Sequence, residues 1–134
     1  MSPKLKTRDV PKAQYSNYLQ RAQECLSSAR MACEREEWNS SAINSIHAVI
    51  AVADSVCVYF LGKRHSGEDH NEAVKLFKSV KDDDDTATNA NRISRVLRMK
   101  NMAEYEERLV TRSEAQKILQ DAERLAEFVK KRVA

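Results

Sequence analysis

The stretch AINSIHAVIAVADSVCVYFL, residues 42–61, decides the fold of this chain. It is typical of a helix that is apolar on nearly every side, with Ile50 among its core residues, and such a helix belongs in the centre of a bundle. At about 100° per residue, its interruptions Asn44, His47 and Asp54 fall on one arc. Buried polar groups need partners. The arc therefore either hydrogen-bonds to a neighbouring helix or lines a groove for a ligand or RNA together with Arg64.

The same stretch is also long enough to span a membrane. Its polar side chains would be costly in lipid, however, and the other predicted helices are amphipathic. We therefore predict a buried helix and no association with a membrane. Residues 1–12 are polar and basic without an apolar run, so no signal peptide is expected. Three cysteines without a CxxC pair indicate reduced thiols, and both features favour a cytoplasmic protein.

Length and composition favour one helical domain. The chain has 134 residues, 42% of them hydrophobic, but only two glycines and two prolines. So few turn-forming residues disfavour a sheet protein. The net charge of +3 permits nucleic acid as a partner without requiring it. We predict an all-α, four- to five-helix up-and-down bundle over residues 11–134, preceded by a flexible basic arm over residues 1–10.

Apolar stripes at helical spacing predict the other helices. One runs from Pro11 to about residue 36. Asn39, Ser40 and Ser41 are possible N-caps for the central helix, and Gly62 is its expected C-cap. The remaining helices are predicted over residues 69–80, 86–105 and 111–133. Asp69 with Glu72, and Thr111 with Glu114, have the spacing of capping boxes. The four aspartates at 82–85 are expected to form a solvated connector that can also cap the next helix.

The segment GKRHSGEDH, residues 62–70, is the first place to look for chemistry. It turns between the buried helix and the next helix start. A guanidinium can bind a phosphate at two points, and an imidazole exchanges protons near neutral pH. Arg64 and His70 could therefore act together on a phosphodiester, with His65 as a further substrate contact. The alternative is that all three are ordinary solvated turn residues.

A second basic feature is Arg92, Arg95 and Arg98, which share one broad face of a helix without acidic residues. They could contact phosphates, or they could pair with the acidic residues at 82–85 or 104–107. Tyr105 at the exit of this helix either binds substrate or only packs its ring. No glycine-rich phosphate loop, HExxH, CxxC or GxSxG motif occurs. We therefore expect no metal site and no cofactor.

Together these residues resemble the HEPN (higher eukaryotes and prokaryotes nucleotide-binding) superfamily of small helical bundles. The matching features are the Ala-rich helix with an internal polar residue over 42–61, the turn with Arg64 and then His70, the late Tyr105, and the capped Ala-rich last helix. The ribonuclease signature of this superfamily is an arginine, often a polar residue, a few variable positions and a histidine. Arg64-His65 followed by His70 is similar to that signature.

The resemblance implies a homodimer in which Arg64 and His70 of each subunit line a shared cleft. Val56, Val58, Tyr59 and Phe60, which follow closely on one another, also suggest surplus apolar surface for a dimer. Active members cleave RNA without metal, often as toxins. Other members bind nucleotides or act as adaptors for a nucleotidyltransferase or an antitoxin. In toxins silenced by nucleotidylation a tyrosine stands two positions after the histidine, where this chain has Glu72.

Overall fold

The structure, a computed structural model, describes residues 5–133 and shows an all-α bundle with one small antiparallel sheet. This confirms the predicted fold class. The α-helices and strands have these bounds: β1 Thr7–Asp9, α1 Tyr15–Glu34, α2 Trp38–Leu61, β2 Lys63–His65, α3 His70–Lys78, α4 Asp84–Arg98, α5 Lys100–Tyr105 and α6 Arg112–Arg132. A short 3-10 turn, η1 (Lys12–Gln14), leads into α1.

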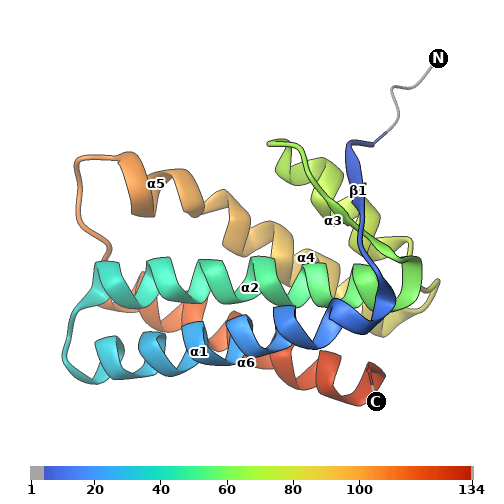
Figure 1. The fold of residues 1–134 in the computed structure, drawn as a ribbon. Coiled ribbons are helices and arrows are strands. Elements are labelled where there is room, and N and C mark those ends of the chain that lie inside the picture. The colour runs from blue at the N-terminus through green and yellow to red at the C-terminus, as the bar shows by residue number, and fades with distance from the viewer. Residues whose placement is uncertain (1–4, 134) are drawn as a thin grey trace.

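Helix α2 is the centre of the bundle. It packs against α1 and α6 along its length and also contacts α3, α4 and α5 (Figure 1). Twelve of its 24 residues are buried. By length and composition α2 could also cross a membrane, but its burial among the other helices is consistent with a soluble protein. The central position follows from its nearly continuous apolar surface, whereas each neighbour offers a single stripe.

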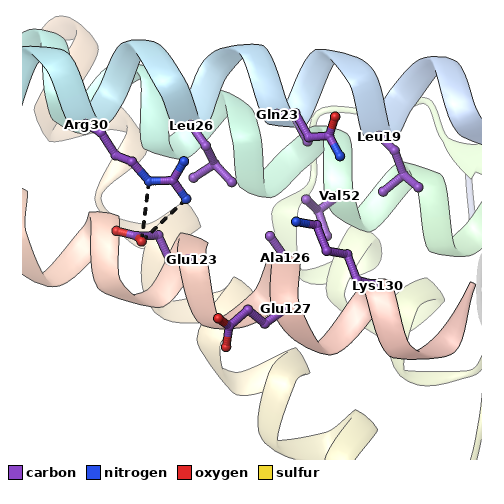
Figure 2. A pocket seen from close by; sticks show the side chains of 10 residues that line it. Leu19, Gln23, Leu26, Arg30, Val52, Glu123, Ala126, Glu127 and Lys130 are labelled. Carbon is purple, nitrogen blue, oxygen red and sulfur yellow. Dashed lines mark hydrogen bonds and ion pairs between the residues drawn. The ribbon is translucent and has the colours of Figure 1, made fainter.

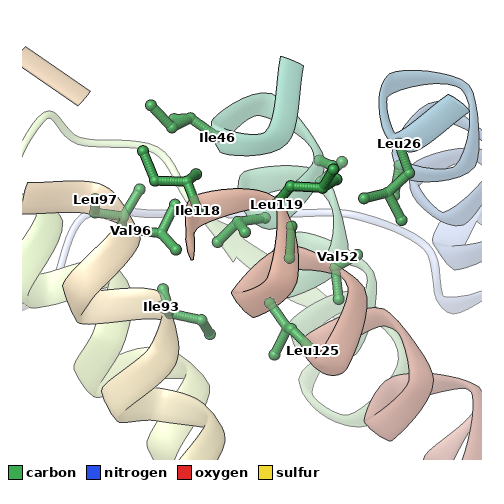
Figure 3. Close-up of a cluster of buried hydrophobic side chains, with 14 of the residues drawn as sticks. Leu26, Ile46, Val52, Ile93, Val96, Leu97, Ile118, Leu119 and Leu125 are labelled. Carbon is green, nitrogen blue, oxygen red and sulfur yellow. The ribbon is translucent and has the colours of Figure 1, made fainter. Parts of the chain in front are cut away.

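The core is one cluster of mostly aliphatic side chains (Figure 3). Phe77 from α3 also belongs to this cluster. Ile46 from α2 and Phe77 are fully buried. Ile50, which the sequence places in the core, is only partly buried and lines a cavity instead. Fully or nearly fully buried side chains also come from α4 and α6, namely Ile93, Val96, Leu125 and Val129.

Local capping signals in the sequence set several helix ends. Gly62 ends α2 with φ 68°, a left-handed conformation that glycine adopts without a Cβ clash. Thr111 and Glu114 form the predicted capping box at α6, with both bonds present. Asp69 caps α3 by accepting a bond of 2.9 Å from the backbone N–H of Asn71. The second bond of the expected capping box, from the backbone N–H of Asp69 to the side chain of Glu72, is missing, because Glu72 contacts His65 instead.

Two predicted helix boundaries are wrong. Helix α2 begins at Trp38 with Glu37 as N-cap, so the expected caps lie inside its first turn. Two of them have tertiary partners: Ser41 Oγ donates to the carbonyl of Ala29 at 2.9 Å, and Asn39 Oδ1 accepts from the N–H of Val110 at 2.9 Å. The helix expected over residues 86–105 is divided at Met99 into α4 and α5.

The acidic run at 82–85 caps the next helix, as the sequence predicts, and also has a partner on α6. Asp83 caps α4 by accepting from the N–H of Thr86 at 2.8 Å. Its other carboxylate oxygen accepts from Arg132 at 2.9 Å, which ties the end of α6 to the start of α4. These bonds hold the pKa of Asp83 well below its usual range, the bonds from Thr86 contributing most.

Part of the segment predicted as a basic arm forms a strand in the structure. Thr7–Asp9 form β1, which pairs antiparallel with β2. The next residue, Val10, is buried and donates its N–H to the carbonyl of Gly62 at 2.9 Å. The local sequence does not indicate a strand, because the pairing partner comes from the far side of α1 and α2. Residues 1–4 of the predicted arm lie outside the described residues.

Candidate functional site

A cavity of about 200 Å³ lies where the second half of α2 meets β2, the start of α3, and α4. It brings together four residues singled out from the sequence: Asp54, Arg64, His65 and His70. Its other walls are mostly small or apolar, so the charged groups share a partly desolvated space. The remaining lining residues are Ile50, Ala53, Ser66, Gly67, Ala73, Ile93 and Leu97.

Arg64 reaches the cavity because the chain reverses at Gly62. The left-handed turn ends α2 and starts β2 at Lys63, so the guanidinium of Arg64 comes back toward Asp54 on α2. Arg64 is half-buried, and its Nη1 donates to the carbonyl of His65 at 3.1 Å. This bond uses one of its five N–H donors. The remaining donors are available to an anion in the cavity.

His70 is the first residue of α3 and is exposed to solvent at the mouth of the cavity. The start of a helix favours negative charge. Here Asp69 already accepts one of the first N–H groups of α3, which reduces the attraction for an incoming phosphate. Because His70 is exposed and Arg64 is half-buried, the imidazole of His70 is the more accessible proton-exchanging group and the guanidinium of Arg64 is the more protected anion-binding group.

His65 has a partner within the protein. Its Nε2 lies 3.3 Å from Oε2 of Glu72 on α3, and its side chain is only 10% exposed. Gly67 packs beside it, since a Cβ at that position would lie 3.3 Å from the same nitrogen. The pair joins β2 to α3 and so fixes Arg64 and His70 relative to each other. This arrangement favours a positioning role for His65.

Asp54 is the residue of the cavity whose ionisation is most strongly changed. Burial raises its pKa to about 6, and the nearby charges of Arg64 and Arg21 oppose that rise. Arg21, on the outer face of α1, is a neighbour that the sequence analysis missed, because no local pattern links it to Asp54 on the next helix. The carboxyl group is thus poised to exchange a proton in weakly acidic solution.

A stability prediction follows from the raised pKa of Asp54. Between about pH 4 and about pH 6 the carboxyl of Asp54 is protonated more often in the folded protein than in the unfolded chain. The stability that this protonation contributes is therefore lost as the pH rises through that range. Asp54→Asn should therefore raise the free energy of unfolding at pH 8, by at most ~3 kcal/mol, and by almost nothing at pH 4. Chemical denaturation at both pH values measures this, with Asp82→Asn as the exposed control. A variant less stable than wild type at pH 8 would contradict it.

The polar arc of α2 does not form one groove. Asn44 donates from Nδ2 to the carbonyl of Ser40, in its own helix, at 2.9 Å. His47 is exposed, and its Nε2 lies 3.3 Å from Oε1 of Glu104 on α5. Only Asp54 lines the cavity. Tyr105 is also remote, being 73% exposed with Lys100 over its ring.

The three arginines of α4 have separate partners. Arg92 donates to Oδ1 of Asn89 at 2.9 Å, and Arg95 lies 3.3 Å from the buried carboxylate of Asp121 on α6. Arg98 contacts only Ser94 Oγ, at 3.4 Å, among the bonds found in residues 5–133. None of the three pairs with the acidic runs considered from the sequence. Arg98 alone approaches the site, because it and His70 line a shallow hollow of about 360 Å³ between α3 and α4.

A further cavity, of about 140 Å³, lies between α1 and α6 (Figure 2). Its floor is apolar, with Leu26 and Val52, and an ion pair of 3.4 Å between Arg30 and Glu123 spans one end. None of the residues predicted to bind substrate lines it. We assign it no function. Within the described part of the chain, no group of three or more His, Cys, Asp or Glu side chains could hold a metal ion.

Comparison with known proteins agrees with this architecture. The family model described as HEPN domain matches residues 15–132, from the first residue of α1 to the last residue of α6. No match was found among curated proteins. The matched range holds the central helix and the cavity with Arg64 and His70. Because the match covers most of the chain, the protein belongs to the HEPN domain family.

Proposed function

We propose that this protein is a metal-independent RNA endonuclease. The observation that carries the proposal is that Arg64, His70 and Asp54, from three different elements, line one cavity. Within it a partly buried guanidinium stands near an accessible imidazole. Phosphodiester cleavage in RNA needs these two groups, one to bind the phosphate and one to move a proton, since the substrate supplies its own nucleophile.

In the proposed reaction the 2′-hydroxyl of a ribose attacks the adjacent phosphorus atom. His70 accepts the proton of that hydroxyl. The bond from phosphorus to the 5′-oxygen breaks, and the leaving oxygen takes a proton from solvent. The products are a 2′,3′-cyclic phosphate and a 5′-hydroxyl. Arg64 binds the non-bridging oxygens, whose negative charge increases in the transition state.

The surroundings of His70 suggest the path of the RNA. On one side of this residue lies the cavity with Arg64, and on the other side lies the hollow with Arg98. A strand that passes over His70 with its scissile phosphate at Arg64 would bring a flanking phosphate into the hollow, where Arg98 attracts it and Glu68 and Asp69 oppose it. Asn44, His47 and Tyr105 are left out of the proposed site because they lie elsewhere on the bundle. Arg92 and Arg95 are left out because they are held by Asn89 and Asp121.

The proposal includes a homodimer in the cytoplasm, with a nucleotidyltransferase or an antitoxin as a possible regulator of a toxin-like activity. The apolar surface available for a dimer is smaller than the sequence suggested. Val56 and Val58 are buried within the chain, and Tyr59 packs edge-on against Tyr15 with ring centroids 4.9 Å apart. Phe60, which is 44% exposed, is the residue of this run that remains for a partner.

The direct test is cleavage of a labelled single-stranded RNA in buffer with EDTA. Wild-type protein should cleave it, because Arg64 and His70 provide the charge and the proton transfer. Arg64→Lys should lose about 100-fold or more in rate, since an ammonium group cannot make the planar two-point contact. Arg124→Ala, an exposed arginine of α6, is the matched control and should keep wild-type activity.

Two results would change the assignment. Absence of cleavage by wild-type protein would contradict the endonuclease proposal and favour a non-catalytic nucleotide-binding or adaptor subunit. Titration with ATP, followed by protein chemical shifts of the cavity residues, would then test that function. Cleavage that stops in EDTA and returns with added metal would contradict the metal-independent mechanism.

A further inference from the structure

Strand β1 brings an additional arginine to the site. In the register of the two-stranded sheet, Arg8 lies directly opposite Arg64. Directly opposite residues share one face of a sheet, with Cβ atoms roughly 4.5–5.5 Å apart. The two arginine side chains therefore start from neighbouring positions on one face of the sheet, one on each strand. Arg8 is exposed and Arg64 is half-buried, so the pair extends from the cavity toward solvent.

This pairing works against the stability of the sheet. Like charges directly opposite each other are destabilising. The neighbouring pair on the other face, Asp9 with Lys63, has opposite charges, as stability alone would favour. Asp54 and His65 O offset part of the charge of Arg64, but no bond or ion pair links Arg8 to an acidic group within residues 5–133. An anion between the two arginines would turn the repulsion into a shared attraction.

The position of Arg8 is fixed by backbone bonds on both sides of it. The N–H of Val10 donates to the carbonyl of Gly62 at 2.9 Å, and the N–H of Ser66 donates to the carbonyl of Lys6 at 3.0 Å. Val10 is also buried. The family match starts at Tyr15, so Arg8 lies outside the matched segment.

We propose that Arg8 is a further substrate-binding residue, which binds a phosphate next to the one held by Arg64. The ligand class is a chain with consecutive phosphates, and the proposed function makes this the backbone of single-stranded RNA. The inference rests on the proposed function for the identity of that chain. The chemistry that it needs is only two neighbouring phosphate groups, which inorganic pyrophosphate and ATP also offer.

RNA binding provides the first test, measured by fluorescence anisotropy in the His70→Ala background so that the RNA stays intact. Arg8→Ala should weaken binding by up to about tenfold. It should also lower the slope of log affinity against log salt concentration by about 0.7, the value for one lost contact to a single strand. In the His70-containing protein the same change should raise KM and leave kcat within about twofold. Arg124→Ala is the control for both measurements.

Thermal unfolding provides a second test that does not depend on cleavage. In buffer alone, Arg8→Ala should be as stable as wild type or slightly more stable, because the like-charge pair is removed. Inorganic pyrophosphate should raise the Tm of wild type by mass action. This rise should be smaller in Arg8→Ala and in Arg64→Ala, and the double variant should show little further loss, since both residues hold one ligand. ATP in a parallel titration separates a nucleotide ligand from RNA.

The outcomes separate the inference from the proposed function. If wild type cleaves RNA but Arg8→Ala matches Arg124→Ala in salt slope and in KM, the inference is wrong and the endonuclease proposal stands. If wild type does not cleave RNA but the pyrophosphate effect requires Arg8 and Arg64, the phosphate pair stands and the endonuclease proposal fails. If wild type neither cleaves RNA nor gains stability from pyrophosphate, both are wrong.

Discussion

His70→Ala should lower the rate of RNA cleavage by roughly 10²–10⁴-fold, the usual contribution of general acid–base catalysis. The substitution removes the group that accepts the proton of the 2′-hydroxyl. His70 is exposed at the first turn of α3, and the cap of that helix is Asp69. We therefore expect its loss to leave the fold intact. Initial rates on a single-stranded RNA, with circular dichroism and thermal unfolding on the same samples, make the measurement.

His47→Ala is the matched control for this prediction. His47 is also exposed on a helix, but it pairs with Glu104 on α5 and does not line the cavity. Equal losses in both variants would contradict the assignment of the site. Wild-type activity in His70→Ala would contradict the catalytic role directly. The pH dependence of the cleavage rate that an ionising imidazole gives to wild type should be absent in His70→Ala.

Phe77→Ala should reduce the free energy of unfolding by about 3–5 kcal/mol, the range for large-to-small substitutions of buried aromatic residues. Phe77 is fully buried, and only it and Leu76 are buried in α3. The substitution leaves a void in a core that the short helix cannot refill. Chemical denaturation measures the loss. Because α3 carries His70, we also expect RNA cleavage to fall at temperatures well below the Tm.

Phe60→Ala is the control with the same change in side chain. Phe60 lies near the end of α2, is 44% exposed, and makes an edge-on contact with Tyr59 at 4.8 Å between ring centroids. The expected loss is about 1 kcal/mol, which corresponds to one aromatic pair without a buried cavity. Equal losses for Phe60 and Phe77 would show that α3 is not anchored through its aromatic residue.

The sequence alone determined the features that arise from neighbouring residues. The nearly uninterrupted apolar run in residues 42–61 predicted the central helix, because a helix without a polar face must be buried. Gly62 and the Thr111–Glu114 pair predicted two helix ends, since these signals act over one turn. The short segment from Arg64 to His70 identified the corner of the bundle, and in the structure both residues line one cavity.

Tertiary structure decided which polar residues reach that corner. Asn44, His47 and Asp54 share one arc of α2, yet each meets a different environment. Asn44 bonds to Ser40 in its own helix, His47 pairs with Glu104 on α5, and only Asp54 lines the cavity. Helical periodicity gives the direction of a side chain but not which neighbour it meets at each level along the axis. Strand β1 could not be predicted for the same reason. Its partner β2 lies beyond two long helices in sequence, and only their antiparallel packing brings Arg8 opposite Arg64.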